Sequence, residues 1–271
     1  MKKTKSILFF LCLSASLATR AQSDSSFTFI KIIKGSYSAF SVDNLDNLYL
    51  ITAGNQLKKT DPKGDSVAVY NDVKRYGSLY AIDVTNPLKV LLYYKNFATV
   101  VVLDRFLNTR NTINLRKQNI FSVNSITTSY DNNIWLFDEQ EYKLKKIGDD
   151  GRLLQETTDF RMLFDSVPAA VQLTDRNNFI YLYDTAKGFY IFDYYGSFKS
   201  RLPFTGWNNV AVADKNMYGF AGNTLYSYQF NSLTVKEYPL PSFFGTYNAI
   251  KAINGKVYLL KDDGIYIYQV Q

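Results

Sequence analysis

The sequence predicts an all-β fold, a six-bladed β-propeller closed by its N-terminal strand. The chain has 22 Tyr and 20 Phe, and its apolar runs are separated by Gly, Pro, Asn and Asp with hardly any helical periodicity. Such a composition favours strands joined by tight turns. A unit of this kind recurs roughly every 40 residues, which is a typical period of propeller blades.

The clearest unit covers residues 129–153, SYDNNIWLFDEQEYKLKKIGDDGRL. Turn residues at 131–133 are followed by a short apolar run, and the chain turns back over 138–141. The segment 142–147 then alternates with period two before a Gly-Asp-Asp-Gly turn at 148–151. Strand signals joined by tight turns indicate a sheet built from hairpins.

The other units align with this one on the aromatic or aliphatic residue that follows the first Asn/Asp turn. These residues are Tyr49, Leu91, Trp135, Tyr181, Tyr218 and Tyr258. In the first unit the alignment predicts strands at 39–42, 48–51, 56–59 and 66–70. Four short strands in each of six units predict six blades.

The sixth unit has one strand signal too few, because it offers only 249–253, 256–260 and 265–270. At the other end of the sequence, the run 27–33, FTFIKII, has no partner in its own unit. We therefore expect 27–33 to be the outer strand of the last blade. That pairing would close the ring and cover two sheet edges that otherwise invite aggregation.

Short patterns that precede Asp/Gly turns support the same architecture. They are Asp46-Asn47-Leu48-Tyr49, Asn133-Ile134-Trp135 and Asn178-Phe179-Ile180-Tyr181. On these patterns the chain resembles the NHL and TolB-like six-bladed propellers over nearly all of residues 22–271. The resemblance implies an architecture and no particular activity, since propellers host many unrelated functions. The WD dipeptide, the kelch double glycine and the sialidase boxes are absent from the sequence.

Residues 1–21 are predicted to be a cleaved secretory signal peptide, which leaves 22–271 as a single propeller domain. Three lysines precede an apolar run at 7–17 that is too short to cross a bilayer, and Ala21 is a small residue suited to the last position before cleavage. The expected location is therefore the periplasm or the medium, with no transmembrane segment in the mature chain.

Composition narrows the chemistry of the mature chain. The leader contains four of the 31 basic residues and none of the 24 acidic ones, so the remaining net charge is about +3. Without a Lys/Arg stripe, nucleic acid is not an expected partner. The sequence has no His, and its single Cys, Cys12, lies within the leader. Thiolate, imidazole and Cys/His zinc chemistry are thereby excluded, and no cofactor or metal is predicted.

The connections from the outer strand of one blade to the inner strand of the next emerge on one face, and loop faces carry function. Aromatic rings beside amide groups on this face could stack sugars or hold a peptide. Packing between blades is the alternative role for these rings, because Tyr and Phe abound throughout the chain. The predicted face residues are Tyr37, Tyr76, Phe121, Asn124, Trp207, Asn208, Tyr247 and Asn248.

Turns between second and third strands add carboxylates to the same face, among them Asp138, Asp184, Asp262 and Asp263. Paired carboxylates can perform acid/base catalysis or hold calcium. Asp is equally an ordinary resident of hairpin turns. Whether these four converge is left open by the sequence, and no catalytic residue is predicted.

Blades of this length leave no long lid loops, which favours binding over catalysis. The first hypothesis is an exported, non-catalytic interaction module, a propeller scaffold that binds a protein partner in a cell-envelope complex. The second is a glycan-directed protein that uses the loop face, either a binder or a carboxylate-dependent hydrolase or lyase. A hydrolase requires two carboxylates about 5 to 9 Å apart around one ligand position.

Overall fold

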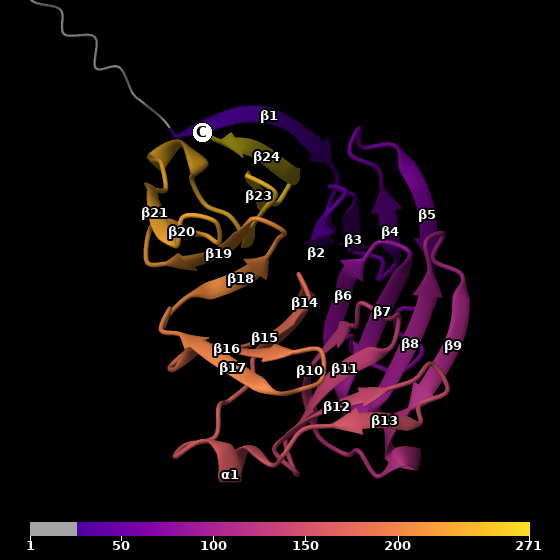
Figure 1. The fold of residues 1–271 in the computed structure, drawn as a ribbon. Coiled ribbons are helices and arrows are strands. Elements are labelled where there is room, and N and C mark those ends of the chain that lie inside the picture. Colours follow the sequence, from indigo (N-terminus) through magenta and orange to yellow (C-terminus); the bar gives the residue numbers. More distant parts are fainter. Residues whose placement is uncertain (1–25) are drawn as a thin grey trace, which may run out of the picture.

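Six four-stranded antiparallel sheets form a ring in the computed structural model, which describes residues 26–271 (Figure 1). This arrangement confirms the predicted six-bladed β-propeller. The predicted signal peptide, with Cys12 in it, lies outside the described residues, so its cleavage stays a prediction. Within 26–271, no helix is both long and apolar enough to span a membrane.

The first five blades each use four consecutive strands, from the axis outward. Blade 1 consists of β2 (Tyr37–Val42), β3 (Leu48–Thr52), β4 (Leu57–Thr60) and β5 (Ser66–Tyr70). Blade 2 consists of β6 (Ala81–Asn86), β7 (Lys89–Tyr94), β8 (Thr99–Asp104) and β9 (Thr109–Asn114). Blade 3 consists of β10 (Val123–Thr128), β11 (Ile134–Asp138), β12 (Lys143–Ile147) and β13 (Leu153–Glu156). Blade 4 consists of β14 (Gln172–Arg176), β15 (Phe179–Asp184), β16 (Gly188–Asp193) and β17 (Phe198–Leu202). Blade 5 consists of β18 (Asn208–Val212), β19 (Asn216–Ala221), β20 (Thr224–Gln229) and β21 (Thr234–Pro239).

Blade 6 combines both ends of the described chain: β22 (Ala249–Ile253), β23 (Lys256–Lys261), β24 (Gly264–Val270) and β1 (Phe27–Lys34). The few helical turns lie in loops: η1 (Lys95–Phe97), η2 (Leu115–Gln118), α1 (Phe160–Leu163) and η3 (Ser242–Phe244).

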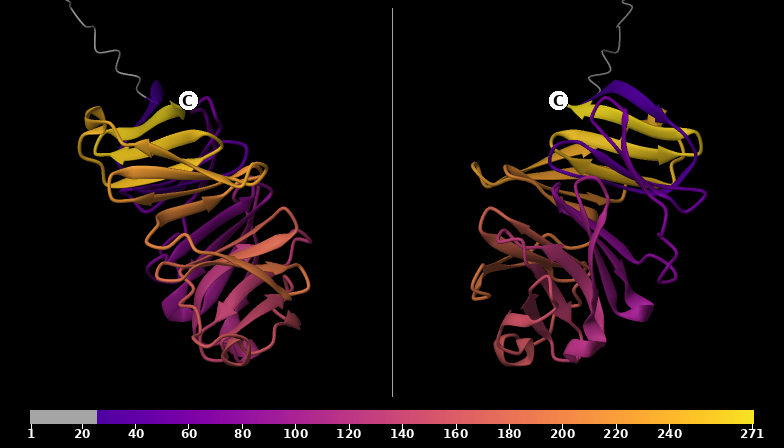
Figure 2. Two further views of the ribbon diagram at one scale, coloured as in Figure 1. Left: turned by 60° about the vertical axis from the view of Figure 1, so that its left-hand side comes forward. Right: turned by 90° about the vertical axis from the view of Figure 1, so that its right-hand side faces the viewer.

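The closing strand β1 runs antiparallel to β24, with Phe27 opposite Val270 and Lys34 opposite Gly264. In Figure 1 the indigo β1 follows the yellow β24, and both views in Figure 2 keep these segments together. The predicted closure is therefore confirmed, with a strand one residue longer than expected.

Hairpin turns on the outer side of the blades are fixed by aspartates. In blade 1, Oδ1 of Asp61 accepts hydrogen bonds from the backbone N–H groups of Lys63, Gly64 and Asp65, each at 2.9 Å. Gly64 has φ +102°, a backbone conformation that side chains disfavour. These are the Asx turns that the Asp/Gly patterns predict.

The hydrophobic core is divided among the spaces between neighbouring blades. All six residues on which the repeats were aligned lie in second strands and are at most 5% exposed, with Trp135 fully buried. One cluster joins Tyr93 of blade 2 to Leu136 of blade 3, and another joins Tyr218 of blade 5 to Ile250 of blade 6. Packing across the ring therefore holds the inner strands at fixed positions around the axis.

Candidate functional site

The six inner strands surround an axial channel with a cavity of about 910 Å³. Residues of β2, β6, β10, β14, β18 and β22 all line it. We call the end that carries the outer-to-inner connections and the second-to-third strand turns the mouth. The opposite end, with the turns between first and second strands, is the floor. Ligand sites in proteins have volumes of this order.

The carboxylate in the channel wall, Asp83, is fully engaged by threonines. Its Oδ1 accepts hydrogen bonds from Oγ1 of Thr85 at 2.6 Å and Oγ1 of Thr127 at 3.3 Å. Its Oδ2 accepts from both the backbone N–H and Oγ1 of Thr128, each at 2.8 Å. Asp83 therefore joins blade 2 to blade 3, and its charge is already solvated by protein donors.

Lys251 is a channel-lining cation in the middle of β22. Its Nζ donates a hydrogen bond to Oγ of Ser41 at 3.2 Å and lies 5.7 Å from the centre of the Phe40 ring. Within the described residues it forms no ion pair. Burial without a counter-charge lowers the pKa of Lys251 to about 8. An ammonium with three donors thus has one protein acceptor.

Arg176 occupies the floor end of β14. Its Nη2 reaches past blade 3 to donate to the carbonyl of Thr85 in blade 2 at 3.1 Å. Its Nη1 lies 3.7 Å from Oδ1 of Asp214, a side chain that is 69% exposed. In the described part of the chain its buried Nε has no hydrogen-bond partner. The guanidinium therefore lines the floor end of the channel and links blade 4 to blade 2.

At the mouth, five residues from blades 2 and 3 and their connections form what we call the mouth cluster: Tyr80, Lys95, Ser122, Asn124 and Glu139. Oδ1 of Asn124 accepts from Tyr80 Oη at 2.7 Å and from Lys95 Nζ at 2.8 Å. Lys95 also lies 5.0 Å from the centre of the Tyr80 ring and 3.4 Å from Oε2 of Glu139. Ser122 Oγ donates to that same carboxylate oxygen at 2.7 Å. The Tyr80 ring, 49% exposed, is thereby held in one orientation.

The eight predicted face residues, all within 26–271, are placed differently from one another. Asn124 is the one that lines the channel. Phe121, Asn208 and Asn248 are exposed. The others are partly or fully buried: Tyr37, Tyr76 and Tyr247 are half-buried against inter-blade clusters, and Trp207 is 5% exposed.

Trp207 lies in the core between blades 4 and 5 instead of at the mouth. Its ring stacks on Phe204 with a centroid separation of 4.8 Å and on Tyr226 at 5.6 Å. A Cβ atom at Gly219 would lie 2.4 Å from Cε3 of Trp207. The missing side chain at Gly219 therefore makes room for the indole, and Trp207 is left out of the candidate site.

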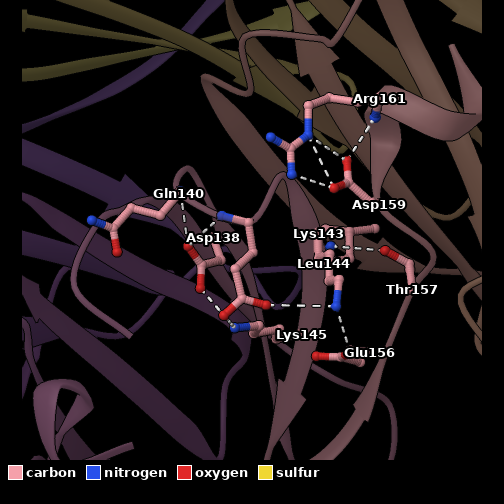
Figure 3. Close-up of polar contacts among 10 residues, drawn as sticks. Asp138, Gln140, Lys143, Leu144, Lys145, Glu156, Thr157, Asp159 and Arg161 are labelled. Atoms are coloured by element: carbon pink, nitrogen blue, oxygen red, sulfur yellow. Dashed lines mark hydrogen bonds and ion pairs between the residues drawn. The ribbon is translucent and has the colours of Figure 1, made fainter. Parts of the chain in front are cut away.

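The carboxylate of Asp138 is occupied within its own blade. Oδ1 accepts from the backbone N–H groups of Gln140 at 2.9 Å and Glu141 at 3.3 Å. Oδ2 accepts from Nζ of Lys145 at 2.8 Å, as Figure 3 shows, and Lys145 also pairs with Glu141 at 2.9 Å. Burial alone would lower the pKa of Lys145, but these two acceptors hold it above its ordinary value. The network stabilises the turn between β11 and β12.

Asp184 serves the equivalent turn of blade 4. Its Oδ1 accepts from the backbone N–H groups of Ala186 at 2.7 Å and Lys187 at 3.1 Å, and its Oδ2 accepts from that of Ala169 at 2.7 Å. Both carboxylate oxygens of Asp184 therefore accept from backbone donors, two in its own turn and one in the connection that precedes β14.

Asp262 and Asp263 belong to the corresponding turn of blade 6. Asp262 accepts from Nδ2 of Asn248 at 3.0 Å, and Asp263 accepts from Oη of Tyr266 at 2.9 Å. The four carboxylates thus have separate partners in three different blades. Among residues 26–271, no group of three or more Asp, Glu, His or Cys is arranged to hold a metal ion.

Tyr80, Arg176 and Lys251 are not among the predicted site residues. A lysine flanked by apolar residues in AIKAI, and an arginine at the end of QLTDR, are local signals of polar groups within inner strands. Their meeting in one cavity depends on the order of the blades around the axis.

The chain matches no protein-family model and no curated protein. Solved structures match its fold at low sequence identity. A protein of Bacteroides fragilis described as exported has 9% identity and a TM-score of 0.60, over 93% of this chain and 98% of that one. PorZ, a surface component of the type-IX secretion system of Porphyromonas gingivalis, has 13% identity and a TM-score of 0.56, over 87% of this chain and 31% of PorZ. A catalytically inactive histidine-to-alanine variant of virginiamycin B lyase from Staphylococcus aureus, solved with quinupristin, has 12% identity and a TM-score of 0.54, over 90% and 88% of the two chains.

Proposed function

We propose that this chain is an exported, non-catalytic interaction module whose mouth face binds a protein partner in a cell-envelope complex. The mouth cluster is the observation that carries the proposal. Tyr80 is exposed, yet Asn124 and Lys95 fix its position through contacts of 2.7 to 5.0 Å. Exposed aromatic side chains that are ordered before binding make effective interface anchors, because little conformational entropy is lost on association.

The carboxylates of the mouth face support a binding role over catalysis. Asp138 and Asp184 are at most 3% exposed, and both bind donors of their own turns. A glycan hydrolase needs two carboxyl groups that face one ligand position. The arrangement of these side chains favours structural roles in three separate turns.

We do not propose the lyase activity of virginiamycin B lyase for this chain, although the two folds are similar. That enzyme is described as inactive when one histidine is replaced by alanine. This chain has no histidine at any position. A propeller of the same architecture therefore lacks the side chain on which that activity depends.

Export and assembly in the envelope are supported by the leader-like sequence at 1–21 and by two of the structural neighbours. One of these is described as exported, and PorZ is described as a surface component of a secretion system. Propellers host many functions, so the likeness supports the location and the module type, and the partner has to be identified by experiment. We retain the NHL and TolB-like resemblance as part of this proposal.

A glycan ligand is the second candidate for the same surface. The Tyr80 ring next to the Asn124 amide and the Lys95 ammonium offers a stacking plane beside polar groups, which suits a sugar. Both hypotheses place the ligand on the same residues. They differ in whether affinity capture recovers a protein or a glycan array shows binding of a sugar.

The test is crosslinking in intact cells, followed by affinity capture and mass spectrometry, with wild type and Tyr80→Ala compared. We expect a stoichiometric envelope protein with wild type and its loss with Y80A, at an unchanged melting temperature. Tyr195→Ala is the control, because Tyr195 is 68% exposed in a turn at the floor end. A partner retained equally by Y80A contradicts the proposed surface. Binding of wild type on a glycan array, without any captured protein, supports the second candidate.

A further inference from the structure

The channel below the mouth cluster holds positive charge without matching negative charge. The charged residues that line the cavity are Lys74, Asp83, Arg176 and Lys251. Asp83 already accepts hydrogen bonds from Thr85, Thr127 and Thr128. Among the described residues it forms no ion pair with Arg176 or Lys251.

We propose that the channel is a binding site for a small organic anion, a carboxylate or phosphate group on an apolar body, held by Lys251 and Arg176. The site is separate from the protein-binding surface at the mouth, and it goes beyond the function proposed above. Its ligand would satisfy donors that the protein itself leaves open.

Lys251 carries the first part of the case. Two of its three ammonium donors have no acceptor among the described residues, since its one hydrogen bond is to Ser41 at 3.2 Å. Burial lowers the pKa of Lys251, and no carboxylate of the described residues pairs with it. An ammonium that is half-buried without a counter-charge is costly, so such a group is usually paired or placed where a charged ligand binds.

Arg176 supplies an independent second part. Its guanidinium lines the cavity, and within residues 26–271 its Nη atoms form one hydrogen bond, from Nη2 to the carbonyl of Thr85 at 3.1 Å. Its nearest carboxylate, on Asp214, is 3.7 Å away and largely exposed at the floor. Guanidinium groups suit carboxylate and phosphate because they present several donors in one plane. Arg176 approaches from blade 4 and Lys251 from blade 6, so both line one cavity from different directions.

The volume and the lining residues of the channel indicate which non-ionic part a ligand would carry besides its anionic group. A cavity of about 910 Å³ is far larger than an inorganic anion. The residues that line it include apolar ones from several inner strands: Ile82, Ile126, Leu173, Val210 and Ile253. An anionic group attached to an aromatic or aliphatic body would place its charge on Lys251 and Arg176 and its apolar part against these side chains.

Isothermal titration calorimetry with defined probes tests the proposal. Benzoate and phenyl phosphate are the anionic probes, and benzamide is the neutral isostere of benzoate. We expect both anions to bind wild type saturably and benzamide not to bind. Lys251→Met and Arg176→Gln should each weaken anion binding about 10- to 100-fold, because each removes a charge-assisted hydrogen bond. The tighter of the two anions identifies the preferred head group.

Lys236→Gln is the matched control, because it removes one exposed cation from outer strand β21. Its affinity for the anions should equal that of wild type. NMR of the lysine side chains supplies a readout at the site: bound benzoate should raise the pKa of Lys251 and leave that of Lys236 unchanged. Circular dichroism establishes that the variants fold. K251M removes a half-buried unpaired charge, and its affinity for the anions tests the proposal if R176Q does not fold. No saturable anion binding to wild type, or equal affinity in wild type and K251M, overturns the proposal.

Discussion

The hydroxyl of Tyr258 donates a hydrogen bond to Oδ1 of Asp46 at 3.1 Å across 212 positions of sequence. The same carboxylate accepts from Nδ2 of Asn254 at 2.9 Å and from Nζ of Lys256. Burial, with the Asp46 charge beside it, raises the pKa of Tyr258, so the phenol keeps the proton that it donates. Asp46 therefore fastens blade 6 to the first turn of blade 1.

Replacing Asp46 should weaken the ring at this junction. Asp46→Gly suits the left-handed backbone there, φ +62°, and removes the acceptor of three donors. We expect a loss of about 1 to 3 kcal/mol in the free energy of unfolding, measured by urea denaturation. Asn178→Gly is the matched control, since Asn178 has φ +65° and an exposed side chain in the equivalent turn of blade 4. Equal losses in both variants would assign the effect to the backbone.

The closing strand should depend on Phe27 much more than on Phe29. Phe27 is 2% exposed, and its ring lies 5.1 Å from that of Phe244, whereas Phe29 is 51% exposed. Phe27→Ala should lower the free energy of unfolding by about 3 to 5 kcal/mol through the cavity it leaves. Phe29→Ala should cost less than about 1 kcal/mol. Similar melting temperatures for the two variants would contradict closure by β1.

Asp175 should make stability fall as pH rises through the mildly acidic range. Burial raises the pKa of Asp175 from 3.8 to about 6, against the opposing hydrogen bond from the backbone N–H of Tyr130. Between these values the folded protein binds more protons than the unfolded chain, so stability decreases with rising pH. Asp175→Asn keeps an acceptor for Tyr130 and removes the charge. It should stabilise the protein by about 1 to 3 kcal/mol at pH 7 and by almost nothing near pH 4. A gain that is the same at both pH values would refute the assignment.

Lys251 should have the opposite dependence. Its pKa is about 8 in the folded protein and 10.5 ordinarily, so between these values the unfolded chain binds more protons and stability rises with pH. Lys251→Met should exceed wild type in stability by about 1 to 3 kcal/mol below pH 8. That advantage should shrink as pH approaches 10.5. Denaturation series in buffer without organic anions measure the difference, and a constant difference across the window would contradict it.

The blades could be predicted because their signals are local. The turn before Trp135 and the alternation that follows it are contained in about two dozen residues, and the same pattern recurs five times. The closure by 27–33 also follows from counting strand signals. The last unit lacks one strand and the first segment has no partner, so pairing the two completes the sixth sheet.

The site could be predicted only in part. Trp207 follows a glycine in a connecting loop, which suggested exposure, and the glycine that accommodates its ring lies 12 residues later at Gly219. Asn124 reaches the channel as part of β10, while Arg176 reaches Thr85 past an entire blade. Contacts of this range depend on the number of blades and on side-chain direction, neither of which is encoded in a short motif.

The pairing of Phe27 with Val270 also sets an order of events during folding. Blades 1 to 5 can each form from adjacent hairpins, but blade 6 has to wait until nearly all of the chain is present. Closing a loop about six times longer than one blade adds only roughly 1.5 kcal/mol of entropy, because this cost grows with the logarithm of length. The delay is therefore chiefly kinetic, as expected for a contact of such high sequence separation. Until β24 is made, β1 has no partner strand, and during this interval a chaperone would protect its open edges.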